Sequence, residues 1–221
     1  MTEFQGRQDG YIEGSLRQVP GLQSLHRMAS LLLRERVPDN ARILVVGAGG
    51  GLEINALAQA NRGWTFEGVD PSADMLGLAQ QTTCTYASRV KLYRGDINAA
   101  PDEPFDGALC LLVFHHISLD ARLKILNGVK RRLRSGSPFV LAHVSFPQDE
   151  PERSVWIARH ISYGTPEDTD PEKIEVASTA MRERLLILDP LREEELLRDS
   201  GFQGVVNFYT ALSFRGWLAY A

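Results

Sequence analysis

A glycine-rich loop and two acids that follow it are the residues of this chain whose types and spacing could bind a ligand. Gly47, Gly49 and Gly51 lie in ILVVGAGGGLE, between an aliphatic run and a helical stretch. Glycine lets the backbone turn tightly there and lets a ligand approach it with no β-carbon in the way. Asp70 and Asp96 each come at the end of a later β-like run. The loop and the acids therefore predict one binding site for a nucleoside-shaped ligand.

The spacing of this loop narrows the ligand. Dinucleotide enzymes use GxGxxG, which needs a small residue where this chain has Leu52, so the GxGxG pattern disfavours a nicotinamide cofactor. Asp70 could accept hydrogen bonds from both hydroxyls of a ribose, or it could form a simple Asp-Pro turn. Asp96 could accept from an adenine amino group while the backbone of Ile97 meets the ring edge, or it could be a turn acid.

Two histidines supply the candidate catalytic groups. His115 and His116 come directly after an apolar run that reads as the fourth strand. One of them could act as a general base, because imidazole titrates near neutrality. The alternative is that both cap the end of the strand and bond to backbone groups.

Alternating strands and helices are predicted to position these residues. Runs of β-branched and aliphatic residues predict strands at 41–47, 65–69, 90–95, 107–114 and 138–144. Helical spacing of apolar residues predicts helices at 21–36, 52–62, 72–81 and 120–133, with a short turn before the break at Pro20. This alternation predicts an α/β fold with a doubly wound, mostly parallel, Rossmann-like sheet.

The second half of the chain adds a hairpin and an insertion. A helix at 192–200 precedes strands at 205–210 and 213–220, whose short connection permits only an antiparallel hairpin. The polar segment before it carries helices at 154–162 and 172–186 and is predicted to be a substrate lid, with surface decoration as the alternative. We expect one domain over 1–221, made of a helical cap (1–38), a cofactor-binding core (39–145), the lid (146–189) and a C-terminal helix and hairpin (190–221).

Composition excludes several classes of protein. The 221 residues carry 24 Lys and Arg against 28 Asp and Glu, a net charge of −4 with no basic run, so tight non-specific binding of nucleic acid is not expected. The longest apolar run is far shorter than the roughly 20 residues that cross a bilayer, and the N-terminus has no apolar signal core. Cys84 and Cys110 fit neither a zinc site nor a disulfide scaffold. A cytoplasmic protein without a metal is expected.

Several segments together resemble the class I S-adenosylmethionine-dependent methyltransferases. They are VVGAGGGLE, FEGVDPSADML, YRGDI, FDGALCLLVFHHI, LRSGSPFVLAHVS and the terminal hairpin, which cover residues 40–145 and 190–221. The resemblance implies an enzyme with S-adenosyl-L-methionine as its cofactor. It also implies a seven-stranded sheet whose last strand is antiparallel, with the cofactor lying across strands one to four.

The resemblance also implies roles for particular residues. Gly47 and Gly49 would line the methionine part, Asp70 would hold the ribose, and Met75 would pack on the adenine. Asp96 and Ile97 would contact the adenine edge, and Leu112 and Val113 would lie near the sulfonium. The implied cofactor site is Gly47, Ala48, Gly49, Gly51, Asp70, Pro71, Met75, Asp96, Ile97, Leu112 and Val113.

One residue departs from the family pattern. The family usually has an acid two residues before the first glycine of the loop, and this chain has Val45. The change removes a group that helps to order the loop and the amino end of the cofactor. It keeps open the alternative of a non-catalytic, cofactor-binding regulatory protein.

A bacterial branch that modifies wobble uridine in tRNA with carboxy-S-adenosylmethionine is similar in two segments, QVPGLQSLHRMASLLL and FYTALSFRGWLAYA. That branch has a Tyr after the VPG and an Asn on the fourth strand, where this chain has Leu22 and Leu111. It also uses an Arg in the region of Arg182 and Arg184. The lost polar partners favour ordinary S-adenosylmethionine as the cofactor.

The leading hypothesis is an enzyme that methylates a small-molecule metabolite or natural product at oxygen, nitrogen or carbon by in-line transfer. The alternative tRNA-modifying enzyme predicts a basic groove of Arg182, Arg184, Arg192 and Arg198. A homodimer is compatible with either hypothesis. Further candidates for contacting the substrate are Tyr11, His26, Arg27, Trp156, His160 and Tyr163.

Overall fold

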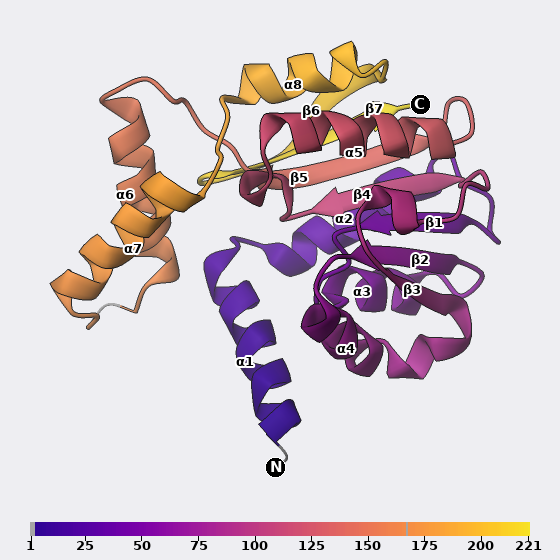
Figure 1. Cartoon of the computed structure of the whole chain (residues 1–221), viewed down its shortest axis with the longest axis horizontal. Helices are drawn as coiled ribbons and strands as arrows, with labels where there is room; N and C mark the ends of the chain where they lie inside the picture. The colour runs from indigo at the N-terminus through magenta and orange to yellow at the C-terminus, as the bar shows by residue number, and fades with distance from the viewer. Residues whose placement is uncertain (1–2, 167) are drawn as a thin grey trace.

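A seven-stranded sheet runs through the centre of the molecule (Figure 1). The computed structural model describes residues 3–166 and 168–221. Within them the strand order is β3-β2-β1-β4-β5-β7-β6, and β1 to β5 are parallel whereas β7 runs antiparallel to both β5 and β6. The strands are β1 (Arg42–Val46), β2 (Thr65–Asp70), β3 (Val90–Arg94), β4 (Gly107–Leu111), β5 (Pro138–Val144), β6 (Gln203–Ala211) and β7 (Phe214–Tyr220). The predicted mostly parallel sheet with a terminal antiparallel hairpin is confirmed.

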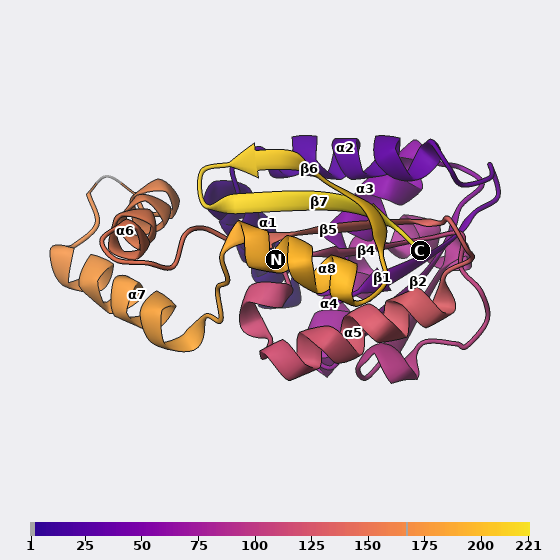
Figure 2. The same cartoon turned by 90° about the horizontal axis from the view of Figure 1, so that it is seen from above.

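Both faces of the sheet are covered, which explains why its central strands are aliphatic throughout. Ile43 and Val45 of β1 belong to one core, and Leu44 and Val46 belong to the other, because successive side chains of a strand point to opposite faces. Helices α2 (Leu22–Arg34) and α3 (Leu52–Ala60) cover the first face, and α5 (Leu119–Arg132) and α8 (Pro190–Asp199) cover the second (Figure 2). Helix α4 (Ala73–Thr82) packs beside α3 and against β2 and β3.

Three further helices stand at the side of the sheet where β5 ends. Helices α6 (Glu152–Gly164) and α7 (Pro171–Arg184) pack on each other and extend away from the sheet (Figures 1 and 2). Helix α1 (Glu3–Gln18) contacts both α2 and α6. It corrects the short turn expected before Pro20, because the chain is helical for 16 residues there. Gly21, with φ 67°, separates α1 from α2 at the predicted break.

The predicted subdivision of the chain stays a prediction. Its helical cap includes residues 1 and 2, and its lid includes residue 167, all of which lie outside the described residues.

The fourth strand ends earlier than its sequence predicts. The apolar run predicts a strand over 107–114, whereas β4 ends at Leu111. Leu112 has φ 63°, a left-handed conformation that a strand cannot contain, and it turns the chain into a 3-10 segment, η3 (Phe114–His116). A non-glycine residue seldom adopts this φ, and such residues gather at functional sites. Two other 3-10 segments are η1 (Cys84–Arg89) and η2 (Ile97–Ala99).

A buried ion pair joins the helices on the second face. The Arg122 guanidinium of α5 binds the Glu193 carboxylate of α8, and each side chain is only 1% exposed. Arg122 also donates to the carbonyls of Ile117 and Leu186. Glu193 in turn lies 3.6 Å from Nε2 of His143 on β5. One guanidinium therefore holds together α5, α8 and the segment that follows α7.

Replacing this carboxylate should destabilise the protein strongly. Glu193→Gln leaves the Arg122 charge buried without its counter-charge, and we expect a loss of about 3–5 kcal/mol in the free energy of unfolding. Urea unfolding followed by circular dichroism measures it. The matched control is Glu195→Gln on the same helix, whose exposed pair with Arg192 contributes about 0–1 kcal/mol. Equal losses in the two variants would contradict the role given to the buried pair.

Candidate functional site

A cavity of about 820 Å³ lies at the carboxyl ends of the parallel strands. The sheet order puts β1 beside β4, and their connections leave in opposite directions along the sheet. Open α/β sheets bind ligands at this kind of switch point. The predicted residues that line the cavity are Gly47, Gly49, Asp70, Pro71, Met75, Asp96, Ile97, Leu112, Val113, His115 and His116. The structure thus brings residues that follow four successive strands, β1 to β4, to one hollow.

Two predicted residues lie behind the cavity wall. Ala48 is fully buried, and its methyl group fills the space beside Gly68 of β2. Gly51 has φ 78° at the start of α3, where a β-carbon would lie 3.0 Å from the backbone of Ala79. Neither is among the lining residues, so both support the loop from behind.

The glycine loop is held by backbone bonds and by close packing. The N–H groups of Gly47 and Ala48 both donate to the Val69 carbonyl at the end of β2, at 2.9 and 3.0 Å. Gly47 has φ 71°, and a β-carbon there would lie 2.3 Å from Cγ2 of Val113. Only glycine combines that conformation with so little space. Contacts within the protein therefore fix the shape of the loop.

The two predicted acids are both turn acids and cavity residues. Asp70 accepts from the N–H of Gly49 through Oδ2 at 3.0 Å and from the N–H of Ser72 through Oδ1 at 2.8 Å. Asp96 accepts from the N–H of Asn98 at 2.9 Å and caps η2. Each carboxylate oxygen keeps acceptor capacity after one such bond. The turn role is thus observed for both acids, and their contacts with a ribose and an adenine stay predictions.

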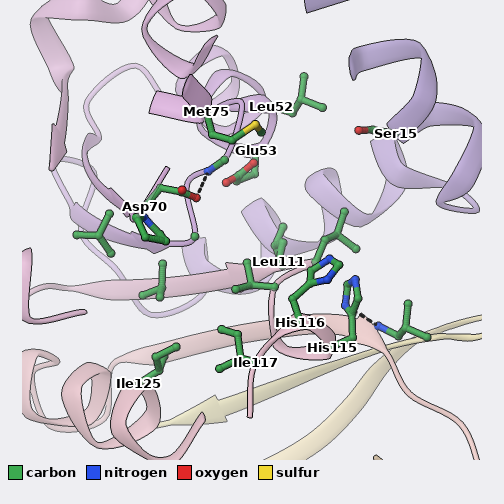
Figure 3. Close-up of a pocket in the computed structure, with 18 of the residues that line it drawn as sticks. Ser15, Leu52, Glu53, Asp70, Met75, Leu111, His115, His116, Ile117 and Ile125 are labelled. Carbon is green, nitrogen blue, oxygen red and sulfur yellow. Dashed lines mark hydrogen bonds between the residues drawn. The ribbon is translucent and has the colours of Figure 1, made fainter. Parts of the chain in front are cut away.

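The two histidines differ in what their rings can do. His115 is buried, and its Nδ1 accepts from the N–H of Val144 at 3.5 Å. His116 is exposed at the cavity, with its ring centroid 4.1 Å from that of His115 (Figure 3). Partial burial of its ring lowers the pKa of His116, and full burial together with neighbouring positive charge holds the pKa of His115 well below its usual value. Both rings are therefore neutral at pH 7.

The remaining candidates from the sequence separate into two groups. Tyr11, His26 and His160 line the cavity. Arg27 and Tyr163 are exposed, and Trp156 stacks on Phe146. Burial lowers the pKa of His26 to about 4 and also lowers that of His160. The histidine end of the cavity is therefore lined by uncharged imidazoles.

Tyr11 closes the cavity over the glycine loop. A β-carbon on Gly50 would lie 2.4 Å from the Tyr11 ring, and one on Gly49 would lie 3.4 Å from its hydroxyl. The N–H of Gly50 and the hydroxyl of Ser15 hydrogen-bond this hydroxyl. Helix α1 thus packs on the loop itself.

Glu53 is a cavity residue that the sequence reasoning did not select. It lies in the first turn of α3 with 8% of its surface exposed, and burial raises the pKa of its carboxyl to about 8. The signal that could have identified Glu53 is its place in VVGAGGGLE, directly after the glycine loop. Its burial depends on how α3 packs and could not be read from the sequence.

The two-helix insertion reaches the site in two ways. His160 on α6 and Leu185 directly after α7 line the cavity. The N–H of Leu186 donates to the carbonyl of His115 at 2.8 Å.

Among the described residues, no cluster of side chains could hold a metal ion, and no helix is long and apolar enough to cross a membrane.

This geometry defines a class of protein. A GxGxG loop after β1, acids after β2 and β3, and a hairpin that adds an antiparallel β7 match the arrangement that the resemblance of the sequence to the methyltransferases implies.

Comparison with known proteins agrees with that class. Residues 43–136 match a family model described as "Methyltransferase domain". This match covers less than half of the chain, and it agrees with the class I S-adenosylmethionine-dependent methyltransferase superfamily, the enzyme activity and the cofactor that the sequence predicts.

Curated relatives match over most of the chain at low identity. A carboxy-S-adenosyl-L-methionine synthase of Campylobacter lari is 23% identical over 208 residues, which are 92% of this chain and 87% of the relative. An uncharacterized methyltransferase of Anoxybacillus flavithermus is 30% identical over 106 residues, 47% of each chain.

Solved structures show the same fold. An O-methyltransferase family protein of Burkholderia thailandensis superposes with a TM-score of 0.69 at 12% identity, covering 98% of this chain and 59% of that one. Human N-acetylserotonin methyltransferase in complex with S-adenosylmethionine gives 0.60 at 14% identity, covering 90% and 53%. This chain thus spans somewhat more than half the length of these proteins.

The packing of the loop generates a stability prediction. Gly47→Ala should destabilise the fold by about 1–3 kcal/mol or more, because it adds both left-handed strain and the clash with Val113. Gly136→Ala is the matched control, since its φ is 75° and nothing lies within 4 Å of the added carbon. Thermal unfolding of both variants measures the difference. A Gly47→Ala variant as stable as Gly136→Ala would show that Val113 moves aside freely.

Proposed function

We propose that this methyltransferase acts on a small, largely apolar molecule and methylates a hydroxyl or ring N–H group. One observation carries the proposal. A single cavity contains the glycine loop and Asp70 at one end and an accessible, neutral His116 at the other. A methyl donor at the loop end and a methyl acceptor at the other end would therefore lie in the same cavity as a group that can accept a proton.

The polarity of the lining supports this acceptor class. Leu22, Leu111, Val144 and Phe214 line the cavity together with the neutral histidines. Among the described lining residues, Lys124 is the one lysine, and there is no arginine. An apolar wall excludes water and favours an uncharged acceptor. S-adenosylmethionine brings the methyl group on a sulfonium, so the protein's own work is to align the acceptor and remove its proton.

His116 is better suited than His115 to accept that proton. His115 uses Nδ1 for the N–H of Val144 and is buried, which is the capping role that the sequence left as an alternative. No described residue hydrogen-bonds the ring of His116, and that ring lines the cavity. We assign the role of general base to His116, and we propose that His115 holds His116 in position.

Two alternatives have less support. For tRNA modification, Arg182, Arg184, Arg192 and Arg198 would have to form a basic groove. Three of them, Arg182, Arg192 and Arg198, pair with Glu150, Glu195 and Glu194. For carboxy-S-adenosylmethionine synthesis, which the names of some relatives suggest, the new carboxylate would need polar partners. The structure has Leu22 and Leu111 in the cavity wall. The cytoplasmic location and the homodimer stay predictions.

Binding of the demethylated cofactor tests the proposal. We expect S-adenosylhomocysteine to bind with a Kd well below 1 mM by calorimetry. Asp70→Ala should weaken this binding at least tenfold, because the loop and the ligand then both lose a hydrogen-bond acceptor.

Methyl transfer from labelled S-adenosylmethionine is then assayed with phenols, N-heterocycles and tRNA. Transfer to tRNA alone, or formation of carboxy-S-adenosylmethionine detected by mass spectrometry, would overturn the small-molecule assignment.

The base role generates a second, kinetic prediction. His116→Ala should lower kcat about 10²- to 10⁴-fold and leave the Kd of S-adenosylhomocysteine within twofold. Because the pKa of His116 is lowered, the wild-type rate should stay high below pH 6.5 and fall only as the ring becomes protonated at lower pH. Ser118→Ala is the control, since this exposed residue lies just past η3 and outside the lining. A His116→Ala variant with near-normal kcat would remove the base.

A further inference from the structure

Glu53 is a buried carboxyl group that faces the cavity and has no described partner of opposite charge. It lies in the first turn of α3, beside the glycine loop, and its side chain points toward Asp70 and Met75 (Figure 3). Only 8% of its surface is exposed. Apart from its own backbone N–H, no group among the described residues donates a hydrogen bond to this carboxylate.

The charge around Glu53 makes its position costly without a ligand. Burial raises its pKa, and the negative charge of Asp70 raises it further. The oxygens of Asp70 accept from the N–H groups of Gly49 and Ser72, so Asp70 does not balance a negative charge on Glu53. A buried, unpaired carboxylate is unfavourable unless a cation or donors reach it. The cavity is the side from which such a cation can come.

The other position for an acid near the loop is filled by an apolar residue. Val45 is fully buried in the core on the first face of the sheet and does not line the cavity. The backbone of the loop is also largely committed, because Gly47, Ala48 and Gly49 donate within the protein. Of the described carboxylates in the lining, Glu53 is the one beside this loop that accepts no hydrogen bond from another residue.

We propose that Glu53 binds the ammonium group of the cofactor's methionine part and supplies the carboxylate that the chain lacks at Val45. The inference rests on the proposed function, because it needs the cofactor in this cavity. An ammonium has three N–H donors and a positive charge, which match an ionised carboxylate with free lone pairs. Glu53 then fixes the end of the cofactor that is next to the glycine loop.

The test compares two ligands that differ in this group. S-adenosylhomocysteine carries the amino acid part, whereas 5′-methylthioadenosine lacks it. We expect Glu53→Gln to weaken S-adenosylhomocysteine about tenfold to a hundredfold by calorimetry and to leave 5′-methylthioadenosine within twofold. Asp74→Asn, an exposed carboxylate in the first turn of α4 outside the lining, is the matched control and should change neither.

Proton release gives a second readout on the wild-type protein. An ammonium that binds Glu53 needs the ionised carboxylate, so S-adenosylhomocysteine binding near pH 7 should release protons. Calorimetry in buffers of different ionisation enthalpy measures this release, which should disappear in Glu53→Gln. It should also be absent for 5′-methylthioadenosine.

The outcomes are distinguishable. Equal effects of Glu53→Gln on both ligands, or no effect on either, would overturn the role of Glu53 and leave the proposed function standing. Wild-type protein that binds neither ligand would overturn the proposed function and this inference together. If Glu53→Gln does not fold, wild-type protein is titrated with S-adenosylhomocysteine and with its analogue that lacks only the amino group. Equal affinities for that pair would refute the inference.

Discussion

The placement of β1 beside β4, with crossovers that run in opposite directions, is the constraint on which the site depends. Parallel strands bring their carboxyl ends to one edge, and the change of direction leaves a hollow there that no crossover helix fills. Every predicted loop and acid follows one of these strands. The glycine loop completes the arrangement, because Gly47 has no β-carbon and Val113, just past the end of β4, can pack directly against it. Sheet order and loop conformation therefore produce the cavity together.

The cavity has two chemically different ends. The loop end holds Asp70 and Glu53, which are acceptors, whereas the other end holds neutral imidazoles and aliphatic side chains. Acceptors suit hydroxyl groups and an ammonium, and neutral imidazoles suit an uncharged molecule that must lose a proton. The same burial that makes the histidines poor cations also makes Glu53 a weak acid. Full or partial burial thus favours the uncharged form of the groups at both ends.

The elements with strong local signals could be predicted from the sequence, and those decided by contacts could not. The run ARILVVG ends on a glycine and predicts β1 and its loop directly. Helix α1 contains Gly10 and Gly14, which weaken a helix, and it depends on contacts with α2, α6 and the glycine loop. The end of β4 was predicted too late, because a left-handed Leu112 leaves no mark in a continuous apolar run. In the site, residue types predicted the acids and histidines, but which histidine stays accessible follows from packing.

The hydrogen bond from Leu186 to the carbonyl of His115 links the two-helix insertion to the histidine end of the cavity. His115 and His116 share the peptide group that contains this carbonyl. The segment that follows α7 is therefore fixed to the peptide group at which the backbone of His116 begins. The position of the insertion and the position of the proposed base are in this way connected by one backbone hydrogen bond, although the two segments are about seventy residues apart in the chain.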